Sequence, residues 1–121
     1  MNEHAPGTHT TEVDGGIPLI RVVGALDAVS HRAVAAELDA VVERRPAAVL
    51  LDLREVDFMG SAGIAVLINA HHHASRLHVP FAVIADNRCV LRPLRMSQVD
   101  AALSLHATLE HAIAAVRVVT A

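Results

Sequence analysis

The sequence predicts an α/β domain in which strands and helices alternate along the chain. First, apolar residues make up 53% of the 121 residues, which indicates a packed globule rather than a disordered chain. Second, the apolar periodicity changes repeatedly between a strand pattern and a helix pattern. Third, short and nearly continuous apolar runs stand between the helical segments, as expected for strands that are buried on both faces. Together these observations predict helices packed on a sheet that is mostly parallel in its second half.

The domain is expected to begin after a short tail. Residues 1–11 contain Pro, Gly and clustered Thr and are predicted to be a flexible tail, which leaves residues 12–121 as a single domain. The run 17–26 is rich in β-branched residues and follows the turn signal Asp14-Gly15-Gly16. This pattern predicts a first hairpin.

The rest of the chain alternates between helices and strands. Ser30 is a good N-cap for the first of these helices, and Pro46 ends that helix. Thr108 is expected to cap the last helix. In chain order, the predicted elements after the hairpin are a helix over 30–45, a buried strand over 47–53, a helix over 64–76, a buried strand over 79–85, a weaker helix over 88–98, a short edge strand over 102–107 and a helix over 109–118.

Composition disfavours several classes of function. The net charge is −3, and Lys, Trp and Tyr are absent, so the residues that track phosphates and stack on bases are missing. No apolar run is long enough to span a bilayer, and the polar N-terminus lacks the apolar core of a secretory signal. The single Cys89 excludes an internal disulfide, which suits a reducing compartment. We therefore expect a cytoplasmic protein that binds neither nucleic acid nor membrane.

The stretch Gly60-Ser61-Ala62-Gly63 lies between two strongly apolar runs. As a phosphate-binding loop it lacks the Lys and the glycine spacing of the known motifs. As a nucleophile elbow it lacks the residue that separates the first Gly from Ser in G-x-S-x-G. Two interpretations of Ser61 stay open: it is the N-cap of the following helix, or it is a regulatory serine that another protein recognises. The small neighbours would let a partner approach the backbone closely.

The run His71-His72-His73 invites a metal hypothesis, since imidazole is a common zinc ligand. Successive side chains on a helix point about 100° apart, so these three rings would not converge on one ion. The H-E-x-x-H pair is also absent. We predict solvated histidines on an outer helix face and no metal site.

Several segments together resemble a known family. Residues 24–27 read GALD, 50–68 read LLDLREVDFMGSAGIAVLI, 92–100 read RPLRMSQVD and 109–113 read LEHAI. They look like the STAS domain of bacterial anti-sigma factor antagonists, and the resemblance covers nearly the whole chain. It implies the STAS fold, which is a small mixed β-sheet with about four helices packed mainly on one side.

The resemblance also implies a function. Members of the family bind an anti-sigma factor, often a serine kinase, and so release the sigma factor that it holds. The kinase can phosphorylate a Ser or Thr at the start of the helix after the third strand, and a phosphatase reverses this. ATP and Mg²⁺ would belong to the kinase, so we expect no cofactor and no catalysis in this domain. We expect a monomer or a weak homodimer.

The motif in this chain departs from the commonest family motif, Asp-Ser-Ser/Thr-Gly, in which the residue before the last Gly is modified. Gly60 stands where Asp is usual, and Ala62 occupies the usual acceptor position. Ser61 matches the neighbouring position. Three outcomes are open: Ser61 is the acceptor, the protein is not phosphorylated, or control acts elsewhere, on Thr8, Thr10 or Thr11.

The residues that we expect at the partner-binding surface include the turn and its surroundings. Asp27 is equally well explained as a loop cap ahead of Ser30. The predicted surface consists of Asp27, Gly60, Ser61, Ala62, Gly63, Asn87 and Arg88. Two other functions compete with the antagonist. One is a STAS subunit of a larger complex, of the stressosome or lipid-transport type, and the other is a small hydrolase that uses Ser61 and a histidine.

Overall fold

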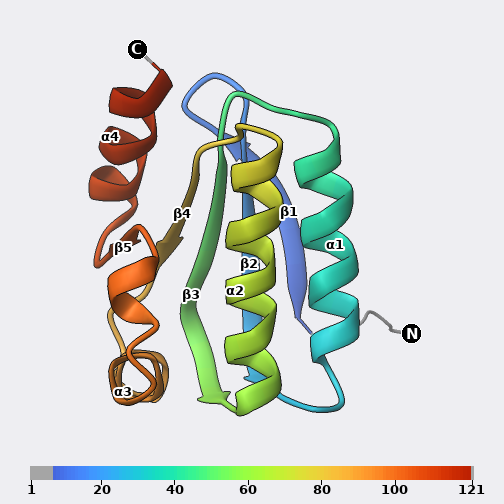
Figure 1. The fold of residues 1–121 in the computed structure, drawn as a ribbon, viewed down its shortest axis with the longest axis vertical. Coiled ribbons are helices and arrows are strands. Elements are labelled where there is room, and N and C mark those ends of the chain that lie inside the picture. Colours follow the sequence, from blue (N-terminus) through green and yellow to red (C-terminus); the bar gives the residue numbers. More distant parts are fainter. Residues whose placement is uncertain (1–6, 121) are drawn as a thin grey trace.

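Five strands form one sheet, with helices α1, α2 and α3 on one face and α4 on the other (Figure 1). The computed structural model describes residues 7–120, and the side chains of residues 7–117. The elements are β1 (Thr8–Val13), β2 (Ile17–Leu26), α1 (His31–Glu43), β3 (Val49–Met59), α2 (Ser61–Arg76), β4 (Phe81–Ile84), α3 (Arg88–Met96), a short 3₁₀ helix (Asp100–Ala102), β5 (Leu105–His106) and α4 (Leu109–Thr120). The strand order is β1-β2-β3-β4-β5; β1 is antiparallel to β2 and the other neighbours are parallel. This confirms the predicted mixed sheet with helices mainly on one side.

The N-terminal hairpin is confirmed, but it begins earlier than predicted. Residues 8–11, which we assigned to a flexible tail, form most of β1. The strand pairs with β2 from Thr8 opposite Val22 to Val13 opposite Ile17. Gly15 and Gly16 have φ values of 84° and 126°, which suits the tight turn between the two strands. The polar side chains of β1 hid this strand, because an edge strand needs little apolar surface. Residues 1–6 of the predicted tail lie outside the described residues.

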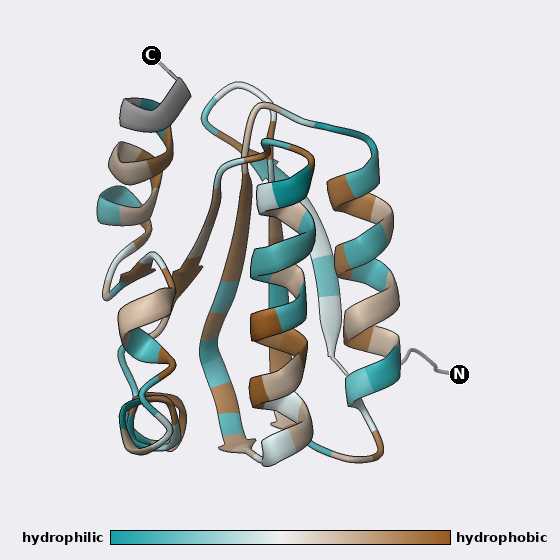
Figure 2. Cartoon of the chain, in the orientation of Figure 1, coloured by the Kyte–Doolittle hydropathy of each residue, from teal (hydrophilic) through white to brown (hydrophobic). Residues whose placement is uncertain are grey.

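Burial on both faces of the sheet explains the apolar runs of the sequence. Along β3, Leu51 and Leu53 belong to the large core under α1, α2 and α3, whereas Leu50 belongs to the smaller core under α4. Figure 2 shows the first half of β3 and all of β4 as apolar, while apolar and polar residues alternate along α1 and α2. Within the described residues, no helix has both the length and the apolarity needed to cross a membrane.

Two helices begin where they were predicted to begin, but the side chains at their N-cap positions make different hydrogen bonds. Thr108 caps α4 as expected, since its Oγ accepts a hydrogen bond of 3.1 Å from the His111 N–H. Ser30 stands at the N-cap position of α1, but its hydroxyl makes no bond to the helix. It donates instead to the Ala25 carbonyl at 2.7 Å, across the preceding loop.

The strand before the small-residue stretch is longer than predicted, and the helix after it starts sooner. β3 continues past residue 53 to Met59, through the polar residues Arg54, Glu55 and Asp57, which are exposed. α2 begins at Ser61 rather than at residue 64. The polar residues interrupt the apolar pattern because this half of β3 is covered on one face only. The stretch is therefore a one-residue link followed by the first turn of a helix.

Candidate functional site

The link between β3 and α2 is fastened to the end of the neighbouring strand. Gly60 is extended, with φ −94° and ψ 179°, and occupies the N-cap position of α2. Its N–H donates to the Leu26 carbonyl at 3.0 Å, and its own carbonyl accepts from the Ile64 N–H at 3.1 Å. The interpretation of Ser61 as the N-cap is therefore wrong. Ser61 is the first helical residue, it is exposed, and its hydroxyl bonds to no residue that the structure describes.

Gly63 has an internal role rather than a contact role. We predicted it as part of the partner-binding surface, but it is buried. A Cβ atom at this position would lie 2.6 Å from the Met59 sulfur and 2.8 Å from the Leu26 carbonyl oxygen. Only a residue without a side chain lets the first turn of α2 pack this closely on the end of β2. Gly60 and Ala62 are partly exposed, so the accessible part of the predicted turn is residues 60–62.

Asp27 shapes the loop that lies against Gly60. Its Oδ1 accepts hydrogen bonds of 3.0 Å from the backbone N–H groups of Ser30 and Val29. The bond from Ser30, followed by the bond from Val29, holds the pKa of this carboxyl below its ordinary value. A Cβ atom on Gly60 would lie 3.9 Å from the Asp27 Cα. Asp27 thus caps its own loop, as the simpler interpretation held, and stands beside the turn.

Two exposed apolar side chains border the turn, and the sequence analysis missed both. Val29, in the Asp27 loop, is 89% exposed, and Phe58, two residues before Gly60, is 53% exposed. The Phe58 ring comes within 3.2 Å of the place where a Gly60 Cβ would stand. Exposed apolar side chains grouped at one place are typical of protein–protein contact sites. Phe58 and Met59 are adjacent apolar residues of one strand, so they point to opposite faces, which was the available signal.

An ion pair between Asp52 and Arg54 lies where the pairing of β3 with β2 becomes irregular. Asp52 is 3% exposed and lies on β3. Its Oδ1 accepts from the backbone N–H and the Nε of Arg54 at 3.0 and 2.9 Å, and its Oδ2 accepts from Nη2 at 2.8 Å. The register between β2 and β3 shifts here. Arg21 faces Asp52 and Val23 faces Glu55, so an advance of two residues on β2 corresponds to three residues on β3. A second shift follows between Gly24 and Ala25 of β2, which face Val56 and Phe58 of β3. After both shifts Met59 is buried and Phe58 is exposed.

The pKa of Asp52 reflects this pairing. Burial by itself would raise the pKa of the carboxyl, but the hydrogen bonds and the positive charge of Arg54 outweigh it and lower the pKa. The same pairing raises the pKa of the Arg54 guanidinium. The pair is therefore charged in the folded protein.

Asn87 and Arg88 follow β4, and Asn87 is bonded to β3. The Asn87 Nδ2 donates to the Val56 carbonyl at 2.6 Å, three residues before the end of β3, and its Oδ1 is buried without a partner among the described residues. Arg88 is exposed and begins α3. Of these two predicted contact residues, Asn87 is thus engaged in a structural bond, whereas Arg88 is accessible.

The remaining candidates are engaged in structural contacts or exposed. Thr10 donates to the Glu37 carboxylate of α1 at 2.6 Å, whereas Thr11 is exposed. His73 was predicted to be solvated, which is wrong: its side chain is 17% exposed, and its ring nitrogens lie 3.0 Å from Asp39 and 3.5 Å from Glu43. Among the described residues, no group of three or more His, Cys, Asp or Glu is arranged to hold a metal ion.

Comparison with known proteins gives consistent similarities. The STAS domain family matches residues 9–112. The anti-sigma-F factor antagonist RsfB of Mycobacterium tuberculosis is 29% identical over 115 residues, which is 93% of each chain. The crystal structure of an anti-sigma factor antagonist from Mycobacterium paratuberculosis has a TM-score of 0.84 at 31% identity, over 91% of this chain and 92% of the other. The antagonist SpoIIAA shares the fold, with a TM-score of 0.76 at 18% identity over 92% and 96% of the chains, and has also been solved in a phosphorylated form.

We predict that Gly63→Ala destabilises the protein. The added methyl group must displace the Leu26 backbone, and overpacking of this kind costs about 1–3 kcal/mol of the free energy of unfolding. Urea denaturation measures the change. Ser61→Ala, two residues earlier on the same helix but exposed, is the matched control and should stay within about 0.5 kcal/mol of wild type. A Gly63→Ala protein as stable as wild type would contradict the packing argument.

We predict that the Asp52–Arg54 pair makes stability depend on acidity. The folded-state pKa of Asp52 is lowered, so its stabilisation is fully present above the unfolded-state value of 3.8 and is lost as the pH falls through the folded-state value. The free energy of unfolding should decrease less steeply below about pH 5 in Asp52→Asn than in wild type.

Arg54→Gln is the complementary variant for that measurement. It keeps the Asp52 carboxyl and the backbone N–H bond from residue 54, but removes the two guanidinium bonds and the positive charge that lower its pKa. The contribution of Asp52 to the acid loss of stability should then become smaller. Identical slopes in the three proteins would show that the pair is not charged as the geometry indicates.

Proposed function

Since this chain belongs to the STAS domain family, we propose that it acts as an anti-sigma factor antagonist. In this role it binds an anti-sigma factor in the cytoplasm and so frees the sigma factor that this partner holds, without catalysis of its own. The observation that carries the proposal is the exposed turn at the start of α2, where Ser61 is exposed together with Phe58, three residues earlier, and with Val29 of the adjoining Asp27 loop. The names of the two mycobacterial proteins support the same role.

The turn suits close contact with a protein. Gly60 and Ala62 have almost no side chain, so a partner would reach the backbone of the turn. Val29 and Phe58 supply the apolar area, which contributes about 25 cal/mol for each Å² removed from water. The hydrogen bonds of Asp27 and Gly60 hold both segments in place before binding, so little ordering entropy is lost. Such a preformed, mostly neutral surface favours binding over chemistry.

A phosphate on Ser61 would act as a switch on this surface. Ala62 has no hydroxyl, so Ser61 is the one residue of 60–63 that a kinase could modify, and its hydroxyl is exposed. Phosphorylation adds a charge of about −1.5 to −2 at neutral pH. The amino terminus of α2 would tolerate this charge in the free protein. In the complex the charge would be buried against Phe58 and near the Asp27 carboxylate, which would weaken binding until a phosphatase removed it.

A second candidate has the same binding surface without a switch. Gly60 and Ala62 replace the acidic and hydroxyl residues of the commonest motif, which favours a chain that is not phosphorylated. Such a chain would act as an unswitched antagonist or as a STAS subunit of a larger complex. Identification of the proteins that copurify with the intact chain separates a single anti-sigma kinase from a multi-subunit assembly.

We predict opposite behaviour for two substitutions of Ser61. Ser61→Asp should weaken the binding of the cognate anti-sigma factor by about tenfold or more, since each tenfold step corresponds to only ~1.4 kcal/mol. Ser61→Ala should bind like wild type. Titration calorimetry measures both affinities.

Intact-mass measurement after incubation with the anti-sigma factor, ATP and Mg²⁺ completes the test. One phosphate on wild type and none on Ser61→Ala are expected. If Ser61→Asp binds as tightly as wild type, the charge switch is rejected while the antagonist role stands. If wild type binds none of the candidate anti-sigma factors, the antagonist role itself is rejected.

We predict that Phe58→Ala and Val29→Ala each weaken that binding by about tenfold, as expected for central apolar contacts. Both side chains are largely exposed, so the free energy of unfolding should change little. Val23→Ala is the matched control, because Val23 is another exposed apolar residue, 37% exposed, earlier on β2. If Phe58→Ala and Val29→Ala bind the anti-sigma factor as tightly as wild type and Val23→Ala do, the partner does not contact the turn.

A further inference from the structure

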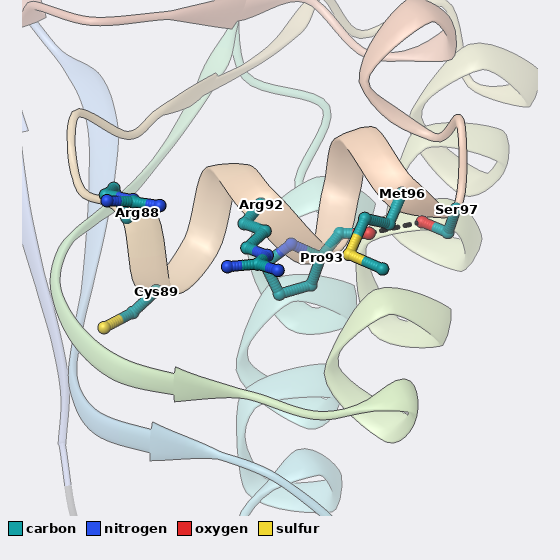
Figure 3. A pocket seen from close by; sticks show the side chains of 6 residues that line it. All are labelled: Arg88, Cys89, Arg92, Pro93, Met96 and Ser97. Carbon is teal, nitrogen blue, oxygen red and sulfur yellow. Dashed lines mark hydrogen bonds between the residues drawn. The ribbon is translucent and has the colours of Figure 1, made fainter.

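Helix α3 separates its residues sharply between two sides. Val90 and Leu94 are buried in the large core. The opposite side carries Arg88 and Arg92, one turn apart, together with Arg95, and all three are exposed. Figure 3 shows the two labelled arginines and the side chain of Met96 along one side of the helix. This outer side is therefore available to another molecule.

The outer side of α3 carries unbalanced positive charge. The helix contains three arginines and no acidic residue, although the whole chain has a net charge of −3. None of the three arginines forms an ion pair with any residue in the described part of the chain. The acidic residue just before the helix, Asp86, contributes to the raised pKa of Arg54. Like charges one turn apart on a helix are mutually destabilising by a few tenths of a kcal/mol, so folding gains nothing from this arrangement.

Apolar atoms lie between these charges. Cys89, Pro93 and Met96 line an open hollow of about 540 Å³, together with Arg88, Arg92 and Ser97. Met96 is 74% exposed, which is unusual for a large apolar side chain. Methionine is flexible and polarisable, so it adapts to the shape of an apolar side chain that a partner inserts. We call this surface, residues 88–97, the α3 hollow.

We propose that the α3 hollow binds an acidic amphipathic segment of another protein. Carboxylates of the segment pair with Arg88 and Arg92, whose planar guanidinium groups suit bidentate carboxylate recognition. An apolar side chain of the segment packs between Pro93 and Met96. None of the residues that line this hollow belongs to the turn at Ser61, so the inference goes beyond the antagonist role and does not depend on it.

Other classes of partner fit this surface less well. A membrane would gain little apolar burial, because Met96 is the one large apolar side chain exposed on α3. Single-stranded nucleic acid is bound by aromatic side chains on which bases stack, and the hollow has none. The combination of fixed positive charges with an apolar floor between them matches a peptide that offers both carboxylates and an apolar anchor.

Selection from a phage library of random peptides on the full-length wild-type protein tests the proposal. We expect enriched peptides that combine Asp or Glu with a Leu, Met or Phe anchor. A synthetic peptide of the enriched sequence should lose at least about tenfold in affinity for Arg88→Glu/Arg92→Glu, and affinity should fall with added salt. Met96→Ser should weaken the same peptide without changing its salt dependence.

Matched controls separate the hollow from general charge effects and from the turn. Arg32→Glu/Arg44→Glu makes the same change of net charge on an exposed arginine of α1 and on the exposed arginine at its C-cap, and should bind the peptide like wild type. Ser61→Asp should also bind the peptide like wild type. Failure of peptide binding at the α3 hollow and failure of anti-sigma factor binding at the turn are therefore distinguishable. Arg88→Gln/Arg92→Gln, which removes charge without reversing it, checks that loss of binding is not loss of folding.

Three results would overturn the proposal. One is the absence of enriched peptides, and another is enrichment of peptides without acidic residues. The third is equal binding of the enriched peptide by wild type and by Arg88→Glu/Arg92→Glu. Vesicles containing phosphatidylglycerol are tested in parallel: if they bind wild type but not the double variant, and no peptide does, the surface is a membrane contact and the proposal is wrong.

Discussion

The approach of α2 to the end of β2 determines the geometry of the whole binding edge. Gly63 packs against Leu26 where no side chain would fit, and the Gly60 N–H bonds to the Leu26 carbonyl. These contacts fix where β3 ends and α2 begins, and they hold the Asp27 loop beside the link. The exposed positions of Ser61, Val29 and Phe58 follow from them. Two glycines that resemble an open docking surface in the sequence thus have different roles, one at the surface and one in the core.

The order and type of nearly all the elements could be predicted from the sequence, because their apolar periodicity is strong. The runs 47–53 and 79–85 are apolar since both faces of the sheet are covered there. β1 and the second half of β3 could not be predicted in the same way. Each is polar on at least one side, and its backbone is paired with β2, which no local pattern reveals.

The site was only partly predictable for a related reason. The turn, Ser61 and Asp27 were identified from their residue types. Phe58 was missed, because two register shifts between β2 and β3 interrupt the alternation of buried and exposed residues before it, and no local pattern reveals them. His73 was assigned to the wrong environment, because its acidic partners lie on α1, far away in the sequence. Residues paired across elements are the ones that local reasoning cannot place.

The early start of β1 bears on where this domain can be shortened. The Val23 N–H donates to the Gly7 carbonyl at 2.8 Å, and residues 8–13 cover the outer edge of β2. A chain trimmed at residue 12, where periodicity alone would set the boundary, would leave most of the β2 edge without hydrogen-bond partners. Bare edges of this kind recruit strands from other molecules. Proteolysis between residues 7 and 12 would accordingly convert a dispersed protein into one prone to aggregation.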